Sequence, residues 1–163
     1  MRRGGKLARG TVLATLVGLL AADTHAAEAP LRLVGRGLIV VPVLLEGRGP
    51  YPFLVDTGST ISVVSEQLAR ELELRPARSA ARVVTLGGRQ ALRKVRVGGI
   101  GLAGEEVGER VVAVANLDAL RRRSLLSLGG ILGNDVLSEF DVVLDYADRR
   151  FKVIRFCPGW WPS

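Results

Sequence analysis

Histidine and cysteine are nearly absent from this sequence, and their scarcity excludes several kinds of catalytic site. The single histidine, His25, falls in a segment that we interpret as a removable leader, so a mature chain would contain none. This excludes Ser-His-Asp and Cys-His catalytic sites and any histidine-liganded metal site. The single cysteine, Cys157, cannot form an internal disulfide or a cysteine cluster. We therefore expect no metal and no cofactor, and acid–base chemistry from carboxylates, lysine or tyrosine.

Aromatic residues are also few, at 5% of the chain, although the formal net charge is +7. Binding of nucleic acid usually needs clustered positive charge together with stacking aromatic side chains. The basic runs Arg121–Arg123 and Arg149–Arg150 stand in predicted loops, where we interpret them as solvated surface. The sequence therefore predicts no nucleic-acid partner.

The first 26 residues have the pattern of a signal peptide. A basic start is followed by the uncharged, mostly apolar stretch Thr11–Ala22, and Thr24-His25-Ala26 fits a cleavage signature. The apolar stretch is shorter than the about 20 residues of a transmembrane helix. We expect an exported protein, periplasmic or secreted; the excess of arginine over lysine favours a bacterial source. The alternative is an uncleaved N-terminal anchor, the one case in which we expect a membrane partner.

The remaining sequence predicts one small all-β domain, a closed barrel or sandwich with one or two short helices. Short apolar runs separated by regular turn signals are typical of that class. We divide the chain into a signal peptide or anchor (1–26), an N-terminal extension (27–36), the domain (37–154) and a C-terminal tail (155–163). The expected helices are 65–74, with Ser65 as a possible N-cap, and 134–138. The expected strands are 38–45, 53–55, 82–86, 91–97, 107–115, 130–133, 141–145 and 150–154.

The run FLVDTGSTISVVS, Phe53–Ser65, carries the strongest chemical signal. An apolar strand delivers one carboxylate, Asp56, into a tight polar turn, and a second apolar run leaves it. Burial without partners raises the pKa of a carboxylate, and perturbed carboxylates are often catalytic. The structural alternative is an ordinary aspartate in a tight hairpin, where Asp and Gly are common.

Three segments in order resemble the retropepsin-like family of aspartic proteases. Phe53–Ser65 resembles the active-site motif of that family. GGILGNDVL, Gly129–Leu137, resembles the apolar-apolar-Gly segment and short helix beside the motif, and Phe140–Val153 resembles the strand-turn-strand that follows. The resemblance implies one retropepsin-like domain from about Leu38 to Val153, and an aspartic endopeptidase that acts on peptides or proteins.

Peptide hydrolysis of this kind needs two carboxylates that share one proton, because like charges placed close together do not both ionise easily. This chain has one Asp-Thr-Gly; Asp135 and Asp145 lack the Thr/Ser-Gly that follows a catalytic aspartate in the family. We therefore expect a symmetric homodimer that pairs Asp56 with Asp56 of a second copy. The alternative function is a catalytically inactive peptide-binding module that kept the fold.

The turn residues have expected roles under this interpretation. The Gly58 backbone N–H can reach the carboxylate, the Ser59 hydroxyl can support its outer oxygen, and the resemblance implies a Thr57 hydroxyl bonded across the dimer. Ile131, Leu132 and Gly133 are expected to pack beneath the catalytic loop, in a structural role.

Leu86, Gly87 and Gly88 are the candidate flap, the glycine-tipped hairpin that retropepsins close over substrate; the alternative is an ordinary hairpin. Asn134 stands where viral relatives often carry arginine. Trp160-Trp161 is either a dimer contact or an exposed tail.

Overall fold

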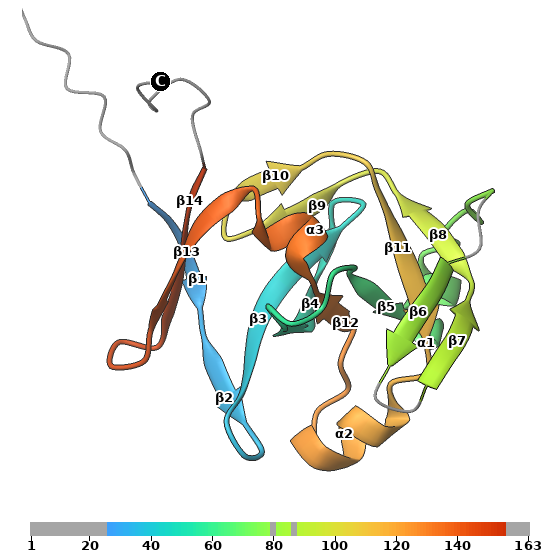
Figure 1. Ribbon diagram of the computed structural model, residues 1–163. Helices are drawn as coiled ribbons and strands as arrows, with labels where there is room; N and C mark the ends of the chain where they lie inside the picture. The colour runs from blue at the N-terminus through green and yellow to red at the C-terminus, as the bar shows by residue number, and fades with distance from the viewer. Residues whose placement is uncertain (1–25, 79–80, 86–87, 156–163) are drawn as a thin grey trace, which may run out of the picture.

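The computed structural model describes residues 26–78, 81–85 and 88–155, mostly as β-strands with three short helices (Figure 1). In chain order the elements are β1 (Ala27–Pro30), β2 (Arg32–Val34), β3 (Leu38–Leu45), β4 (Arg48–Val55), β5 (Val63–Ser65), α1 (Glu66–Glu71), β6 (Ala81–Thr85), β7 (Gly88–Leu92), β8 (Lys94–Val97), β9 (Ile100–Leu102), β10 (Glu105–Val107), β11 (Arg110–Ala115), α2 (Asp118–Ser124), β12 (Gly130–Leu132), α3 (Asn134–Leu137), β13 (Phe140–Asp145) and β14 (Arg150–Arg155).

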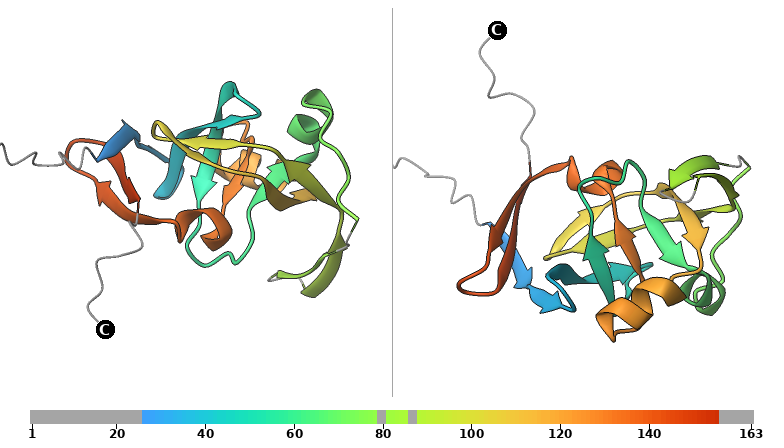
Figure 2. Two further views of the ribbon diagram at one scale, coloured as in Figure 1. Left: turned by 90° about the horizontal axis from the view of Figure 1, so that it is seen from above. Right: turned by 60° about the horizontal axis from the view of Figure 1, so that its bottom comes forward.

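The main sheet has nine strands and curls into a half-barrel (Figures 1 and 2). Its strand order is β10-β9-β3-β4-β12-β5-β11-β8, and β2 pairs with β3 beside this path. A three-stranded sheet, β1-β14-β13, packs at one end, and β6 and β7 form a separate hairpin. The predicted all-β, retropepsin-like class is confirmed. Within the described residues the main sheet is an open half-barrel that ends at β10 and β8, whereas a closed barrel or sandwich was expected, and three short helices are present where one or two were expected.

The residues interpreted as an N-terminal extension contribute to both sheets. β1 pairs antiparallel with β14, with Ala29 opposite Phe151, and β2 pairs antiparallel with β3, with Leu33 opposite Ile39. Leu31, between the two strands, is buried in the main core. This segment is therefore integral to the sheets, a role that its position ahead of the motif does not reveal. The boundaries of the domain and of the tail stay a prediction.

Two apolar clusters lie on opposite faces of the centre of the sheet. Side chains alternate between faces along a strand, so neighbours in β4 go to different clusters. Phe53 and Leu132 belong to the main core, against which Val55 packs, whereas Leu54 belongs to a smaller cluster on the other face. Ile131, paired in register with Leu54, packs against that smaller cluster. The largest fully buried side chains of the main core are Phe151, Leu45, Ile100, Leu102 and Leu132.

The local signal for the cap of α1 is correct in position. Ser65 caps α1, its hydroxyl accepting the Leu68 N–H at 3.1 Å, as the sequence predicts. The helix ends at Glu71, earlier than expected, with Leu72 as its C-cap. No helix within the described ranges has the length and apolar character needed to cross a membrane.

Candidate active site

Asp56 stands at the end of β4, in a turn whose backbone is held by hydrogen bonds. Its N–H donates to the carbonyl oxygen of Leu132 at 3.0 Å, which extends the pairing of β4 with β12 by one residue. Its carbonyl oxygen accepts the Ser59 N–H at 3.1 Å. Its carboxylate oxygen Oδ1 accepts the Gly58 N–H at 3.0 Å. The backbone of Asp56 is therefore held on both sides and one carboxylate oxygen is held by Gly58, while Thr57 and Gly58 are exposed.

β12 lies directly beside this turn, between β4 and β5. Leu132 pairs in parallel with Val55, and Ile131 pairs antiparallel with Val63. The packing leaves no room for side chains at the ends of β12. A Cβ added to Gly133 would lie 2.7 Å from the Ile61 carbonyl carbon. Backbone would have to shift to relieve so short a contact. The structure thus brings the segment Ile131–Gly133 against the Asp56 turn.

Asn134, the first residue of α3, ties the helix to the turn. Its backbone N–H donates to the Ser59 carbonyl at 2.8 Å, and its side-chain amide donates to the Thr57 carbonyl at 3.0 Å. Asn134 therefore holds the start of α3 against the loop that carries Asp56.

Ser62 and Asp135 form a polar contact that the sequence analysis missed. The Ser62 side chain is 2% exposed; its hydroxyl donates to Asp135 Oδ1 at 2.6 Å and accepts the Gly133 N–H at 3.0 Å. This joins the strand after the turn to the β12–α3 junction. The available signal was a serine that interrupts the apolar run from Ile61 to Val64.

The Ser59 hydroxyl makes a different bond from the expected one. It donates to the Ile61 carbonyl oxygen at 2.8 Å. A hydroxyl has one hydrogen, so here it stabilises the backbone of the turn and does not donate to the outer oxygen of Asp56.

The two other carboxylates considered as partners of Asp56 have structural contacts of their own. Asp135 accepts the Ser62 hydroxyl. Asp145 caps the β13–β14 turn: the backbone N–H of Asp148, which bonds to Oδ1 at 3.0 Å, lowers the pKa of Asp145, and Lys152 at 3.6 Å acts in the same direction. Across the described ranges there is no group of three or more His, Cys, Asp or Glu side chains arranged to hold a metal ion.

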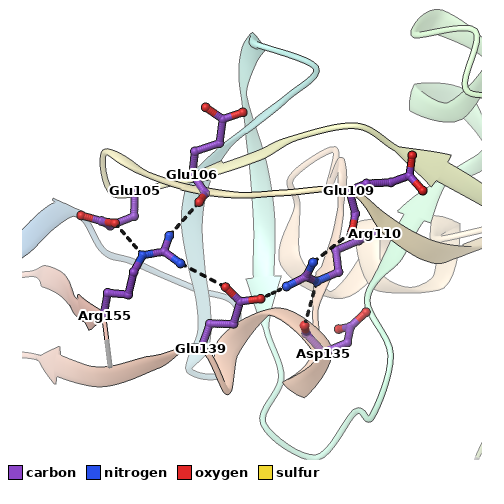
Figure 3. Close-up of polar contacts among 7 residues, drawn as sticks. All are labelled: Glu105, Glu106, Glu109, Arg110, Asp135, Glu139 and Arg155. Carbon is purple, nitrogen blue, oxygen red and sulfur yellow. Dashed lines mark hydrogen bonds and ion pairs between the residues drawn. The ribbon is translucent and has the colours of Figure 1, made fainter. Parts of the chain in front are cut away.

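Charged side chains of β10, β11, β14 and the α3–β13 connection form a network next to α3 (Figure 3). Arg110 forms an ion pair with Glu139, and its Nε donates to the Asp135 carbonyl at 3.3 Å. The Glu139 carboxylate also accepts a hydrogen bond from the Arg155 guanidinium at 3.1 Å, and the Arg155 Nε donates to the Glu105 carboxylate at 3.0 Å. The network connects the last strand of the chain to the helix that contacts the Asp56 loop.

The candidate flap is an antiparallel hairpin of β6 and β7, separate from the main sheet and next to β11 (Figure 1). Thr85 pairs with Gly88, so Gly88 opens β7 and the connection comprises residues 86 and 87. Leu86 and Gly87 lie outside the described residues, as do Cys157 and Trp160-Trp161. The role of this hairpin as a flap stays a prediction.

A small, mostly buried apolar cluster on one face of the sheet includes Leu54, two residues before Asp56. Continued alternation along β4 places Asp56 on the face of Leu54. There Leu54 packs with Val40 and Leu128. Partly buried apolar residues of α2 and its flanks, of β2 and β3, and of β12 surround this cluster: Val34, Leu38, Leu117, Leu120, Leu126 and Ile131.

Comparisons with known proteins agree with this geometry. The family model described as aspartyl protease matches residues 41–136, more than half of the chain. The crystal structure of a retropepsin-like aspartic protease from Rickettsia conorii superposes with a TM-score of 0.53 at 16% identity, over 77% of this chain and 87% of that one, a likeness of fold. The EIAV protease complexed with the inhibitor HBY-793 has a TM-score of 0.49 at 22% identity, over 63% and 88%. No curated protein matches significantly.

The family model spans the Asp56 turn, β12 and the start of α3, the same segments that hydrogen bonds join into one site. Fold and family thus agree, and the chain belongs to the aspartyl proteases, with a retropepsin-like fold.

Proposed function

We propose that this protein is an aspartic endopeptidase whose active site forms when two copies bring their Asp56 carboxylates together. The observation that carries the proposal is the Asp56 turn itself. The Asp56 carboxylate accepts the Gly58 N–H at 3.0 Å, and the backbone N–H of Asp56 donates to the Leu132 carbonyl oxygen at 3.0 Å. A catalytic group must be held in a fixed position if it is to act on a bound substrate.

The chemistry follows from two carboxylates that share one proton. The ionised carboxylate takes a proton from water, which attacks the carbonyl carbon of the peptide bond. The protonated carboxyl gives its proton to the carbonyl oxygen, which forms a tetrahedral intermediate with two hydroxyls. The carboxyl that took the proton from water then passes it to the peptide nitrogen, the C–N bond breaks and the amine leaves, while the other carboxylate takes a proton from one hydroxyl and so restores the starting pair. In this proposed reaction no metal takes part and no covalent intermediate with the enzyme forms.

In a symmetric dimer the second carboxylate is Asp56 of the other copy, so no other residue of the chain is needed. In a twofold interface the same surface of each copy meets its mate. Thr57 and Gly58 are exposed beside Asp56, so the turn is open to such a contact. In the proposed dimer the Thr57 hydroxyl bonds across the interface and holds the two turns in register.

The proposed substrate is a peptide or protein segment bound in an extended form. The partly buried apolar residues that surround Leu54, Leu38 and Ile131 among them, offer apolar contacts for side chains next to the scissile bond. The hairpin of β6 and β7, with Leu86, Gly87 and Gly88 at its connection, is the proposed lid, which would exclude water during the reaction. Export to the periplasm or the exterior stays part of the proposal and rests on the leader sequence alone.

The test is Asp56→Asn in an assay with a fluorogenic peptide library at acid and neutral pH, with and without pepstatin. Asparagine keeps the shape but removes the acid–base group, so cleavage should be abolished while the circular dichroism spectrum is unchanged. Asp141→Asn is the matched control, because Asp141 is an exposed aspartate of β13, and it should retain activity.

Substantial cleavage by Asp56→Asn would contradict the proposal. An inactive wild-type protein that binds library peptides equally well with either residue at position 56 would indicate the peptide-binding module instead.

A further inference from the structure

A groove of about 410 Å³ lies between β1 on one side and β9 and β10 on the other. Most of its lining residues are small: glycines, alanines and a proline. It contains none of the residues that form the Asp56 turn. Because small residues leave backbone and Cβ atoms as the floor, flat side chains could lie close against it.

Leu44 gives this groove an uncovered apolar surface. The side chain is 40% exposed, among the most exposed large apolar side chains of the described residues. Its partner across the strand pair is Gly101, where a Cβ would come within 3.0 Å of the Leu44 Cβ. The glycine leaves the face of Leu44 without a cross-strand neighbour. Covering this apolar surface is favourable because it removes apolar area from water.

The side chain of the last described residue contacts two residues that line this groove. Arg155, the last residue of β14, donates to the Glu105 carboxylate at 3.0 Å and to the Glu106 carbonyl at 2.7 Å (Figure 3). Glu105 and Glu106 both line the groove. Its opposite side carries Glu28 and Ala29 of β1, the strand that pairs with β14. The segment after Arg155 therefore starts beside the groove, at a point fixed by Arg155.

That segment, residues 156–163, has the composition of a groove ligand. It reads FCPGWWPS and has no charged side chain, but it has one phenylalanine and both tryptophans of the chain. Eight extended residues reach about 26 to 29 Å, enough to run along β9 and β10. The segment lies outside the described residues.

We propose that residues 156–163 dock into this groove of their own chain, with tryptophan rings against Leu44 and the glycine floor. The docked segment would then cover the exposed face of Leu44 and close the gap between β1 and β10. The proposal does not depend on catalysis by Asp56. The other conceivable occupants, the same segment of a second copy or a foreign peptide, are outcomes of the test.

Tryptophan fluorescence of the full chain tests the docking directly, because Trp160 and Trp161 are the only tryptophans. Acrylamide should quench this emission several-fold less than it quenches the free peptide of residues 156–163. Emission should also lie at shorter wavelength than in the peptide. Equal quenching of protein and peptide would overturn the proposal.

Two matched variants locate the docking site. Leu44→Glu places a charge in the groove and should raise quenching towards the value of the free peptide. Leu33→Glu changes a leucine of similar exposure, 38%, on β2, and should leave quenching as in the wild type. Equal effects of the two variants would show that the segment does not lie on Leu44.

Two further measurements keep the result decisive. If Leu44→Glu alters the circular dichroism spectrum, labelling of Cys157 replaces it, since this sole cysteine should react several-fold more slowly in the native protein than in the peptide. Docking within one chain is independent of concentration. Protection of the tryptophans that disappears on dilution would overturn docking within one chain and would indicate the segment of a second copy. Protection of the native protein that changes only when a bound foreign peptide is removed would also overturn it and would indicate that peptide as the occupant.

Discussion

The Asp56 loop depends on backbone hydrogen bonds more than on the side chains of the motif. Leu132, Gly58 and Ser59 contact Asp56 through main-chain atoms, and Asn134 contacts Thr57 and Ser59 through their carbonyl oxygens. The side chain of Ser59 also turns inward, to the Ile61 carbonyl. The motif therefore acts first as a backbone shape, in which glycine and short polar residues are needed, and second as a source of one carboxylate.

Ser62 is the residue whose loss should separate positioning from catalysis. Ser62→Ala removes the donor to Asp135 and leaves the Gly133 N–H without its acceptor. A buried donor without a partner costs about 1 to 3 kcal/mol, so the free energy of unfolding should fall by that amount. Because Gly133 follows Leu132, which bonds to Asp56, kcat should fall more than KM changes. Chemical denaturation and steady-state kinetics measure the two effects.

Ser62→Thr keeps the hydroxyl and should restore both values in large part. The matched control is Ser127→Ala, which changes an exposed serine. A Ser62→Ala enzyme with normal kcat at temperatures where it is folded would show that the contact is structural only.

At the scale of single residues, the sequence predicts Asp56 as the catalytic candidate and the hydrogen bond from the Gly58 N–H to its carboxylate, because the two residues are only two positions apart. It does not predict the contact of Ser62 with Asp135, which are 73 positions apart. Such a contact exists only after β12 has entered the sheet between β4 and β5. The direction of the Ser59 hydroxyl also differs from the expectation, because it donates to the Ile61 carbonyl oxygen at 2.8 Å.

The elements most easily predicted are those with strong local signals. β3 has the expected bounds, and β12, α3 and the hairpin of β13 and β14 lie within one residue of the predicted bounds. The connection between β3 and β4 is shorter than the expected strands 38–45 and 53–55 imply: its two residues are Glu46 and Gly47, with φ of 53° and 67°, and Gly49 and Pro50 belong to β4. Positive φ at both positions suits a tight hairpin, and the glycine-rich sequence offered more than one register.

The hairpin of β6 and β7 provides a prediction for an element. Replacing Gly87 and Gly88 with alanine removes backbone conformations that a moving connection needs. We expect kcat/KM to fall tenfold or more, which is about 1.4 kcal/mol in activation free energy. Stability should change less, because this hairpin is a separate two-stranded sheet. Kinetics with one fluorogenic peptide and thermal unfolding provide the measurements.

Alanine at Gly98 and Gly99 is the control. A Cβ there would meet only the flexible ends of Glu46 and Glu106, so little strain should result. If both double variants lose the same activity, or the hairpin variant loses none, the hairpin is not a flap. The proposal for Asp56 would be unaffected by that result.

The whole molecule supplies one copy of each part of the proposed site. The half-barrel, the Asp56 turn and the hairpin belong to a single chain, and the family model covers them once. Sequence alone identifies this arrangement, because a second Asp-Thr-Gly is absent from the chain. It does not identify how the first strands join the sheets, since β1 pairs with β14 across more than 120 residues.

Activity should therefore depend on the concentration of the enzyme. An isolated chain has one Asp56 and half of the proton-sharing pair, so specific activity should fall as the enzyme is diluted below the dissociation constant of its dimer. Sedimentation over the same concentrations should show the dimer separating in step with the loss of activity. Mixing wild type with an excess of Asp56→Asn protein should also inhibit, because mixed dimers contain only one carboxylate. A protein that is monomeric by sedimentation yet fully active would refute the shared site, and Asp135 and Asp145 would be the first carboxylates to test as partners of Asp56.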